Sequence, residues 1–372
     1  MIYLDNAATT LQKPPAVRRA VGQAMATMTS PGRGTYGPAA RASRTLLACR
    51  EAAAALFQAG PPENVVLTFN ATHGLNIALN SLVKPGDRVV LSGYEHNAVT
   101  RPLAAVPDLR VRVVRAPLFR PDRFLEDFAR QLDRGAEVAV CTHVSNVYGY
   151  VLPVEEVADL CRRRGVPLVV DAAQSAGVLP VTLSGWGAAF VAMPGHKGLY
   201  GPQGTGLLLC GGETQPLLYG GTGSQSRQRE MPDFLPDRLE AGTHNVPGAA
   251  GLLEGLRFLR RRGLGTIQRQ ETALVAQAAQ GLARLPGVQV FSGWQRGCQS
   301  GVLSFRLAGR DPGWVADALA QGGIAVRAGL HCAPLAHATG GTGDTGTVRV
   351  SFSTFNTPGE VDRFLKRMAR LA

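Results

Sequence analysis

The chain has 372 residues, which is long enough for a large hydrophobic core and for two domains. With 45% hydrophobic and 18% charged residues, it has the composition of an ordinary globular protein. No apolar run reaches the roughly 18 residues that cross a bilayer, and the start "MIYLDNAATT" has no basic region followed by an apolar one. We therefore expect a cytoplasmic protein without membrane contact. The six cysteines include no C-x-x-C pair, so we expect neither a disulfide framework nor a metal site.

The charge is strongly positive, with 39 Lys and Arg against 27 Asp and Glu and a formal net charge of +12. Such an excess can indicate a nucleic-acid partner. Here only four of the basic residues are lysines, and the arginines are scattered in short clusters. Two clusters, in "CRRRG" and "FLRRRG", fall where helices should end and complement the helix dipole there. We interpret the excess as a bias toward arginine and expect no nucleic-acid partner.

Apolar segments of strand length alternate with helix-length segments between residues 64 and 210. We predict strands at 64–69, 88–93, 137–145, 166–174, 188–193 and 205–210, and helices at 72–83 and 153–165. Near-continuous apolar strands separated by helices are typical of a mainly parallel sheet covered on both faces. This part of the chain therefore predicts an α/β fold.

The pattern changes toward the C-terminus, where the strands become shorter. We predict helices at 246–262, 267–284 and 312–321, and strands at 301–307, 323–329 and 347–353. This alternation favours a smaller α+β domain. We expect a large domain over 15–250 and a small one over 251–372, with residues 1–14 packing near the small domain. No internal repeat is evident.

Polar residues follow several of the predicted strands, at the edge where open α/β sheets bind ligands. Thr72 opens a helix, so it is either an N-cap or part of a phosphate site. Asp171 directly follows four apolar residues, where a carboxylate needs a partner; a ligand-facing acid is favoured over a structural ion pair. Lys197 lies in a glycine-rich loop that lets a ligand approach its amine. Lys13, which precedes two prolines, is given no special role.

These three residues fit the needs of one cofactor. Pyridoxal phosphate requires a lysine for a Schiff base, an acid for its ring nitrogen and an anion site for its phosphate. Lys197, Asp171 and the helix start at Thr72 could supply them in that order.

Motifs along the whole chain carry a family resemblance. They are "YLDNAATT", "THVSNVYG", "VDAAQSAG", "GHKGLYGPQGTG", "EAGTHN", "RAGLHCAP" and "RVSFSTFNT". In this order they resemble the class V aminotransferase family of fold type I pyridoxal-phosphate enzymes, in its cysteine desulfurase and selenocysteine lyase branch. The resemblance implies a mainly parallel, seven-stranded sheet in the large domain and pyridoxal phosphate as cofactor.

The resemblance also implies a role for individual residues. His96 would stack on the cofactor ring and move protons, Asp171 would pair with the ring nitrogen, and Gln174 would face the phenolic oxygen. The remaining contacts implied for the cofactor are Ala71, Thr72, Asn146, His196, Lys197 and, from a neighbouring subunit of a homodimer, Thr243.

Substrate contacts are implied in the small domain. Arg349 and Arg327 would hold the carboxylate of L-cysteine, for which a planar guanidinium is well suited, and Asn146 would lie near the substrate. Cys332 is by itself most simply a packing residue, but the resemblance makes it the nucleophile that takes sulfur as a persulfide and leaves alanine. A nearby arginine and histidine would favour its thiolate. The short interval from Cys332 to Arg349 predicts a compact loop and delivery to a sulfur-acceptor protein.

The chain also departs from the family pattern. Pro194 stands where many desulfurases have a phosphate-binding serine, His73 stands where an acid is common, and segment 220–226 is unusual. Two alternatives therefore stay open. One is another class V reaction, such as a selenocysteine lyase, another amino-acid lyase, an epimerase or an aminotransferase, with Cys332 incidental. The other is a basic nucleic-acid-binding or regulatory protein with a vestigial cofactor fold.

Overall fold

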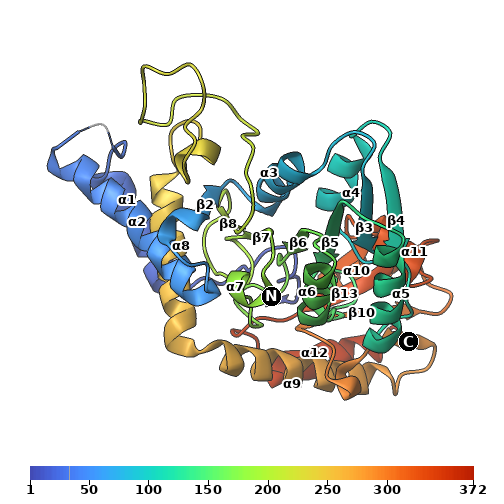
Figure 1. Ribbon diagram of the computed structural model, residues 1–372. Coiled ribbons are helices and arrows are strands. Elements are labelled where there is room, and N and C mark those ends of the chain that lie inside the picture. Colours follow the sequence, from blue (N-terminus) through green and yellow to red (C-terminus); the bar gives the residue numbers. More distant parts are fainter. Residues whose placement is uncertain (33) are drawn as a thin grey trace.

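A seven-stranded sheet forms the centre of the computed structural model, which describes residues 1–32 and 34–372 (Figure 1). Its strand order is β2-β8-β7-β6-β5-β3-β4. The strands are β2 (Val65–Thr68), β3 (Arg88–Ser92), β4 (Arg110–Val114), β5 (Val138–Thr142), β6 (Leu168–Asp171), β7 (Phe190–Pro194) and β8 (Gly206–Cys210). All neighbouring pairs are parallel except those of β8 with β2 and β7. The predicted α/β fold with a mainly parallel sheet is confirmed.

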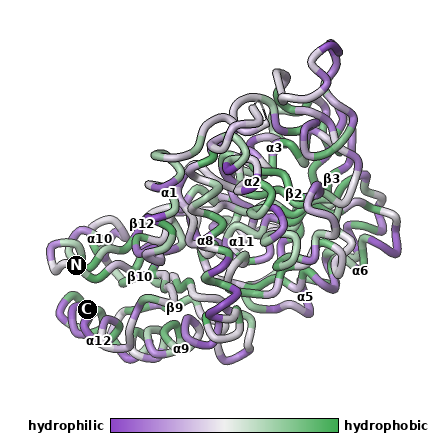
Figure 2. The backbone as a smooth tube through the Cα atoms, turned by 90° about the vertical axis from the view of Figure 1, so that its left-hand side faces the viewer, coloured by the Kyte–Doolittle hydropathy of each residue, from purple (hydrophilic) through white to green (hydrophobic). Residues whose placement is uncertain are grey.

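Helices bury both faces of this sheet. On one face α3 (Ala71–Leu82) and α4 (Asn97–Ala104) pack on the strands. The other face is covered by α2 (Gly37–Phe57), α5 (Pro121–Asp133), α6 (Val154–Arg163), α7 (Leu183–Trp186) and part of α8 (Val246–Arg262). Because both faces are covered, the inner strands are mostly apolar, whereas the edge strand β4 carries arginines. In Figure 2, which colours the chain by residue hydropathy, hydrophobic residues gather in the central strands and hydrophilic ones on outer segments such as α12.

A four-stranded antiparallel sheet in the order β12-β13-β10-β9 organises the C-terminal part. Its strands are β9 (Val288–Phe291), β10 (Val302–Leu307), β12 (Arg327–Gly329) and β13 (Thr347–Ser351). The helices here are α9 (Leu264–Leu282), α10 (Pro312–Gln321), α11 (Pro334–Thr339) and α12 (Pro358–Met368), with α9 and α12 side by side (Figure 1). A separate core joins α9, α10 and α12 to β10 and β13.

The N-terminal segment belongs spatially to this C-terminal part. Strand β1 (Ile2–Tyr3) pairs in parallel with β11 (Ile324–Ala325), and Leu4 is fully buried in the same core. Helix α1 (Pro15–Thr27) then packs against α8. Because α8 crosses residue 250 while packing on α1 and α2, the domain division at that residue stays a prediction.

The structure corrects some expected elements. The expected strand at 323–329 is split into β11 and β12, which pair in different sheets. Strand β4 was not expected, because "RVRVV" alternates charged and apolar residues at the edge of the sheet. Thr72 is not the N-cap of α3: Asn70 has that position, and its side chain accepts a hydrogen bond from the backbone N–H of His73 at 2.9 Å.

Candidate active site

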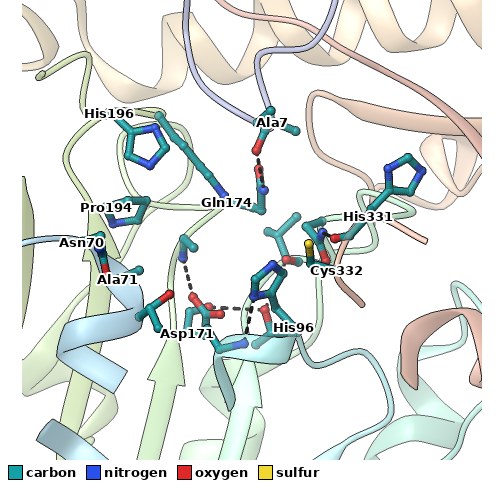
Figure 3. A pocket seen from close by; sticks show the side chains of 18 of the residues that line it. Ala7, Asn70, Ala71, His96, Asp171, Gln174, Pro194, His196, His331 and Cys332 are labelled. Atoms are coloured by element: carbon teal, nitrogen blue, oxygen red, sulfur yellow. Dashed lines mark hydrogen bonds between the residues drawn. The ribbon is translucent and has the colours of Figure 1, made fainter. Parts of the chain in front are cut away.

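A cavity of about 230 Å³ lies at the carboxyl ends of the central strands, and residues of the C-terminal part also line it (Figure 3). It brings together every predicted site residue except Thr243. These lining residues are Ala71, Thr72, His96, Asn146, Asp171, Gln174, His196, Lys197, Arg327, Cys332 and Arg349. The fold therefore brings together residues that lie far apart in the sequence, from Ala71 to Arg349.

Asp171 and Lys197 form the polar floor of the cavity. Asp171 ends β6, is buried, and accepts a hydrogen bond from the backbone N–H of Ala173 at 2.8 Å. Burial raises the pKa of Asp171, against the lowering effects of that hydrogen bond and of Lys197. Burial also lowers the pKa of Lys197 to about 8, with Asp171 opposing the shift. The amine is thus easily deprotonated, as a nucleophilic or basic lysine must be.

His96 sits at the start of α4 as its N-cap. Its Nδ1 accepts a hydrogen bond from the backbone N–H of Ala98 at 3.0 Å. Burial, together with the charge of Lys197 and nearby arginines, lowers the pKa of His96 to about 4. The imidazole is therefore neutral at pH 7, and its acceptor at Nδ1 leaves the proton on Nε2.

The helix start at one end of the cavity is the expected anion site. Asn70, Ala71 and Thr72 line the cavity here, and α3 points its free backbone N–H groups toward it. His196 and Pro194 line the same end, and the proline has neither a hydroxyl nor a backbone donor. The donors of this end are therefore the α3 start, the Thr72 hydroxyl and the imidazole of His196.

The carbonyl oxygen of His196 is held by an unusual number of donors. It accepts from the backbone N–H of Thr10 at 3.2 Å, from the hydroxyls of Thr9 and Thr10 at 3.2 and 3.0 Å, and from Lys13 Nζ at 2.7 Å. Burial lowers the pKa of Lys13 to about 8. The expectation that Lys13 has no special role is therefore wrong: its amine fixes the peptide that precedes Lys197. The sequence signal was the "TTLQKP" stretch, which is rich in donors.

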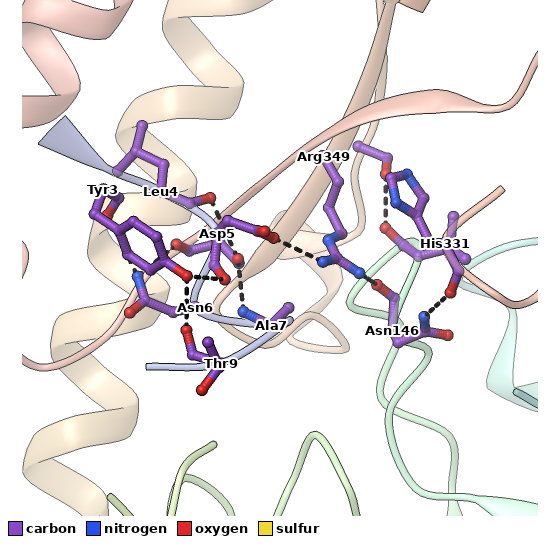
Figure 4. A network of polar contacts seen from close by, with 12 residues as sticks. Tyr3, Leu4, Asp5, Asn6, Ala7, Thr9, Asn146, His331 and Arg349 are labelled. Carbon is purple, nitrogen blue, oxygen red and sulfur yellow. Dashed lines mark hydrogen bonds and ion pairs between the residues drawn. The ribbon is translucent and has the colours of Figure 1, made fainter. Parts of the chain in front are cut away.

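Arg349 is buried at the side of the cavity formed by β13 (Figure 4). Its Nη2 donates to Asp5 Oδ1 at 2.9 Å, and its Nη1 donates to the backbone oxygen of Asn146 at 2.9 Å. The other three guanidinium N–H groups have no partner in the described part of the chain, and Nε is fully buried. Asp5 was not anticipated from the sequence. Arg327 also lines the cavity, but its side chain is exposed.

Cys332 is the one exposed cysteine; the other five are buried. Both His331 and Cys332 adopt left-handed backbone conformations, with φ of 49° and 56°. This conformation costs about 1–2 kcal/mol for each non-glycine residue, so the turn must be held by its surroundings. Asn146 Nδ2 donates to the carbonyl of His331, and the backbone N–H of Asn97 donates to that of Cys332, each at 2.8 Å.

His331 does not act on the thiol in the expected way. Its ring is buried and faces β13, where Nε2 lies 3.1 Å from the backbone oxygen of Thr347. Burial and the charge of Arg349 lower the pKa of His331 to about 2. The ring is neutral, so it supplies no positive charge that would favour a thiolate at Cys332.

Glu95 is a further buried acid that the sequence reasoning missed. Its Oε1 accepts from Ser92 Oγ at 2.5 Å and from the backbone N–H of Thr142 at 2.6 Å. Burial raises the pKa of Glu95 to about 8, so the group is largely protonated at pH 7. It ties the end of β3, which precedes His96, to the end of β5.

Thr243 lies outside this cavity. It is exposed and lines a separate pocket with Phe69, His73 and Glu240. Glu240 holds the preceding turn, because it forms a buried bidentate ion pair with Arg50 at 2.6 and 2.7 Å. Thr243 is thus presented at the surface and does not reach the site of its own chain.

The cavity fits pyridoxal phosphate by the chemistry of its side chains. A buried amine of lowered pKa, a buried carboxyl group at a strand end and a helix start are the three features that the cofactor needs.

No helix of the part of the chain that the structure describes is long and apolar enough to cross a membrane.

Comparisons with known proteins agree with this architecture. The aminotransferase class-V family profile matches residues 2–364, so the chain belongs to that family. A probable cysteine desulfurase of Mycolicibacterium paratuberculosis is 34% identical over all of this chain, which spans only 55% of that protein's length. One from Methanothermobacter thermautotrophicus is also 34% identical, with 94% of its length covered. The apo structure of a Thermococcus onnurineus cysteine desulfurase matches the whole chain with a TM-score of 0.90 at 33% identity.

Proposed function

We propose that this protein is a pyridoxal-phosphate-dependent cysteine desulfurase that converts L-cysteine to L-alanine and carries the sulfur on Cys332. The observation that carries the proposal is the exposed thiol of Cys332 on the wall of the cavity that also contains Lys197. The relatives and solved structures named cysteine desulfurase support the same activity.

In this proposal the large domain holds the cofactor. Lys197 would hold its aldehyde carbon, Asp171 would face its ring nitrogen and His96 would lie against its ring, with Gln174 and Asn146 near its phenolic oxygen. Ala71, Thr72 and His196 receive the phosphate. When bound, pyridoxal phosphate supplies an electron sink that stabilises negative charge on an amino acid's α-carbon.

The chain's own groups orient the substrate and move its protons. The free N–H groups of Arg349 receive the carboxylate of L-cysteine, assisted by Arg327 at the open side of the cavity. The Lys197 amine, whose pKa is lowered to about 8, takes the α-proton. Neutral His96 carries a proton on Nε2. After it gives up this proton, the same nitrogen can accept another, so His96 can move a proton within the cavity.

Sulfur transfer occurs at Cys332. Its Sγ, as a thiolate, attacks the substrate sulfur; a sulfur–sulfur bond forms and the substrate's carbon–sulfur bond breaks. The electron pair of the broken bond stays on the three-carbon fragment, which takes up protons and leaves as alanine. The balance is one L-cysteine and one thiol converted to one L-alanine and one persulfide.

The persulfide then passes to a sulfur-acceptor protein, for instance one that serves iron–sulfur cluster assembly in the cytoplasm. The compact turn at Cys332, held by Asn97 and Asn146, supports delivery to a partner that comes to the enzyme. We also propose a homodimer in which the exposed Thr243 completes the phosphate site of the other subunit.

The decisive experiment is to incubate the holoenzyme with L-cysteine and measure alanine and the mass of the Cys332 peptide. We expect stoichiometric gain of one sulfur atom on Cys332 and loss of alanine formation in Cys332→Ser. The matched control Cys298→Ser, at a buried cysteine outside the cavity, should keep its activity. If Cys332→Ser forms alanine as fast as the wild type, the persulfide proposal is wrong.

A further inference from the structure

A second, smaller cavity of about 30 Å³ lies beneath the Lys197 loop, between the two parts of the protein. Its walls come from the N-terminal segment, from the loops at 173–178 and 197–200, and from α9, β10 and β13. A volume above about 10–15 Å³ can hold one particle of the size of water. The cavity is therefore large enough for a single small ligand.

Glu271 on α9 lines this cavity and is only 4% exposed. Within residues 1–32 and 34–372, its carboxylate has neither a hydrogen bond nor an ion pair, and burial alone raises its pKa to about 8. A Cβ at Gly301 would lie 2.5 Å from Glu271 Oε2, so the absence of a side chain there makes room for the carboxylate. An ionised carboxylate buried without a partner is costly. Without a bound cation the raised pKa therefore leaves Glu271, like Glu95, largely protonated at pH 7.

The other polar groups of the cavity are also oxygen-rich. Ser300 is buried, and its hydroxyl has no partner in the described chain. Asn6 donates from Nδ2 to the backbone oxygen of Ser351 at 2.9 Å, and Gln174 donates from Nε2 to that of Ala7 at 3.0 Å. Asn6 thus spends its donors elsewhere, whereas Gln174 keeps one N–H. Neither side-chain oxygen accepts a hydrogen bond from the described chain, so both oxygens are available.

No cationic group of the described chain compensates Glu271. Lys197 also lines the cavity, but its amine forms no ion pair with this carboxylate, and no neighbouring charge contributes to the pKa shift of Glu271. A water molecule could occupy the cavity while Glu271 keeps its proton. A cation would displace that proton, pair with the carboxylate and also use the surrounding oxygens. With a single carboxylate present, a monovalent ion is favoured over a divalent one, which usually takes several.

We propose that this cavity is a binding site for a monovalent cation of about the size of potassium, held by Glu271 and Ser300 and completed by the oxygens of Asn6 and Gln174. The bound ion would tie α9 and the residues just before β10 to the N-terminal segment and to the loop after β6. It acts as a structural link between the two parts of the protein, and the proposal does not depend on the reaction.

The test compares thermal unfolding of the purified holoenzyme in potassium, sodium and tetramethylammonium chloride. An equal ionic strength of about 0.1 M keeps electrostatic screening the same. We expect potassium to raise the unfolding temperature by about 3 °C over tetramethylammonium, as selective binding to the folded state requires. Glu271→Gln should abolish this difference, and Glu51→Gln, at an exposed position of α2, should retain it.

Crystals of the wild-type holoenzyme grown in rubidium or thallium salts give a second readout that does not need a folded variant. An anomalous peak beside Glu271 is expected. Equal unfolding temperatures in the three salts, a potassium effect that survives in Glu271→Gln, or no anomalous peak would each overturn the proposal. Each would instead mean that the carboxyl group is protonated or hydrated.

Discussion

The buried ion pair between Arg50 and Glu240 allows a quantitative test of how the Thr243 turn is held. Arg50 and Glu240 are 7% and 6% exposed, and Glu240 also accepts from the backbone N–H of Leu67 at 2.6 Å. Glu240→Gln keeps the shape of the side chain but removes the charge, so the guanidinium stays buried without an anion. Breaking a buried pair in this way costs about 3–5 kcal/mol. We expect that loss in the free energy of unfolding, measured by urea denaturation.

The exposed pair Arg88–Glu137 provides the control, because both side chains are more than one-third exposed. Glu137→Gln should cost under about 1 kcal/mol. The double variant Arg50→Met/Glu240→Leu should be more stable than Glu240→Gln, since it leaves no unpaired charge. A loss below about 1 kcal/mol in Glu240→Gln would refute the reasoning, because the arginine would then have another way to satisfy its charge.

Three further outcomes are expected. Lys13→Met should cost about 2 kcal/mol, the value of a charged hydrogen bond, and speed amide exchange in the Lys197 loop, whereas Lys84→Met in an exposed turn should do neither. Burial lowers the pKa of His143 to about 4, below its unfolded value of 6.5. The unfolded chain therefore binds this proton first, and stability falls from pH 6.5 to 4; His143→Phe should remove about 3 kcal/mol of that dependence. Gly149→Ala puts a Cβ 2.2 Å from a backbone oxygen and should cost above about 3 kcal/mol, against about 1 kcal/mol for Gly165→Ala in open space.

Each of these can fail in a distinct way. Unchanged exchange in Lys13→Met would mean that the threonine donors alone hold the His196 carbonyl. An acid titration of His143→Phe that parallels the wild type would place the proton uptake at other histidines. A Gly149→Ala variant as stable as Gly165→Ala would show that the neighbouring strand can move aside.

The central sheet was predictable because its strands are buried on both faces and carry an apolar signal that needs no tertiary information. Edge strand β4 escaped prediction for the opposite reason, since "RVRVV" mixes exposed charges with apolar residues. Asp171 was conspicuous as a charged residue directly after an apolar strand, and Lys197 as a lysine in a glycine-rich loop. Cys332 gained its interest from the family resemblance.

The residues that were missed act through long-range contacts. Asp5 pairs with Arg349, which is distant in the sequence, and the contact depends on β1 joining β11. Lys13 looked ordinary beside prolines because its acceptor, the His196 carbonyl, is brought near only by the fold. The left-handed turn at Cys332 gave no signal either, since neither residue in it is glycine or asparagine.

The contact between Asp5 and Arg349 has a consequence for synthesis. The cavity is lined both by Ala7, which follows Asp5 in the N-terminal segment, and by Arg349 on β13, which is synthesised much later. The sheet that carries Lys197 can fold earlier, as domains commonly do during translation, but the guanidinium finds its counter-ion only when β13 has emerged. A nascent chain that lacks β13 therefore has Lys197 without Arg349 beside it, and the cavity is complete only after β13 has been made.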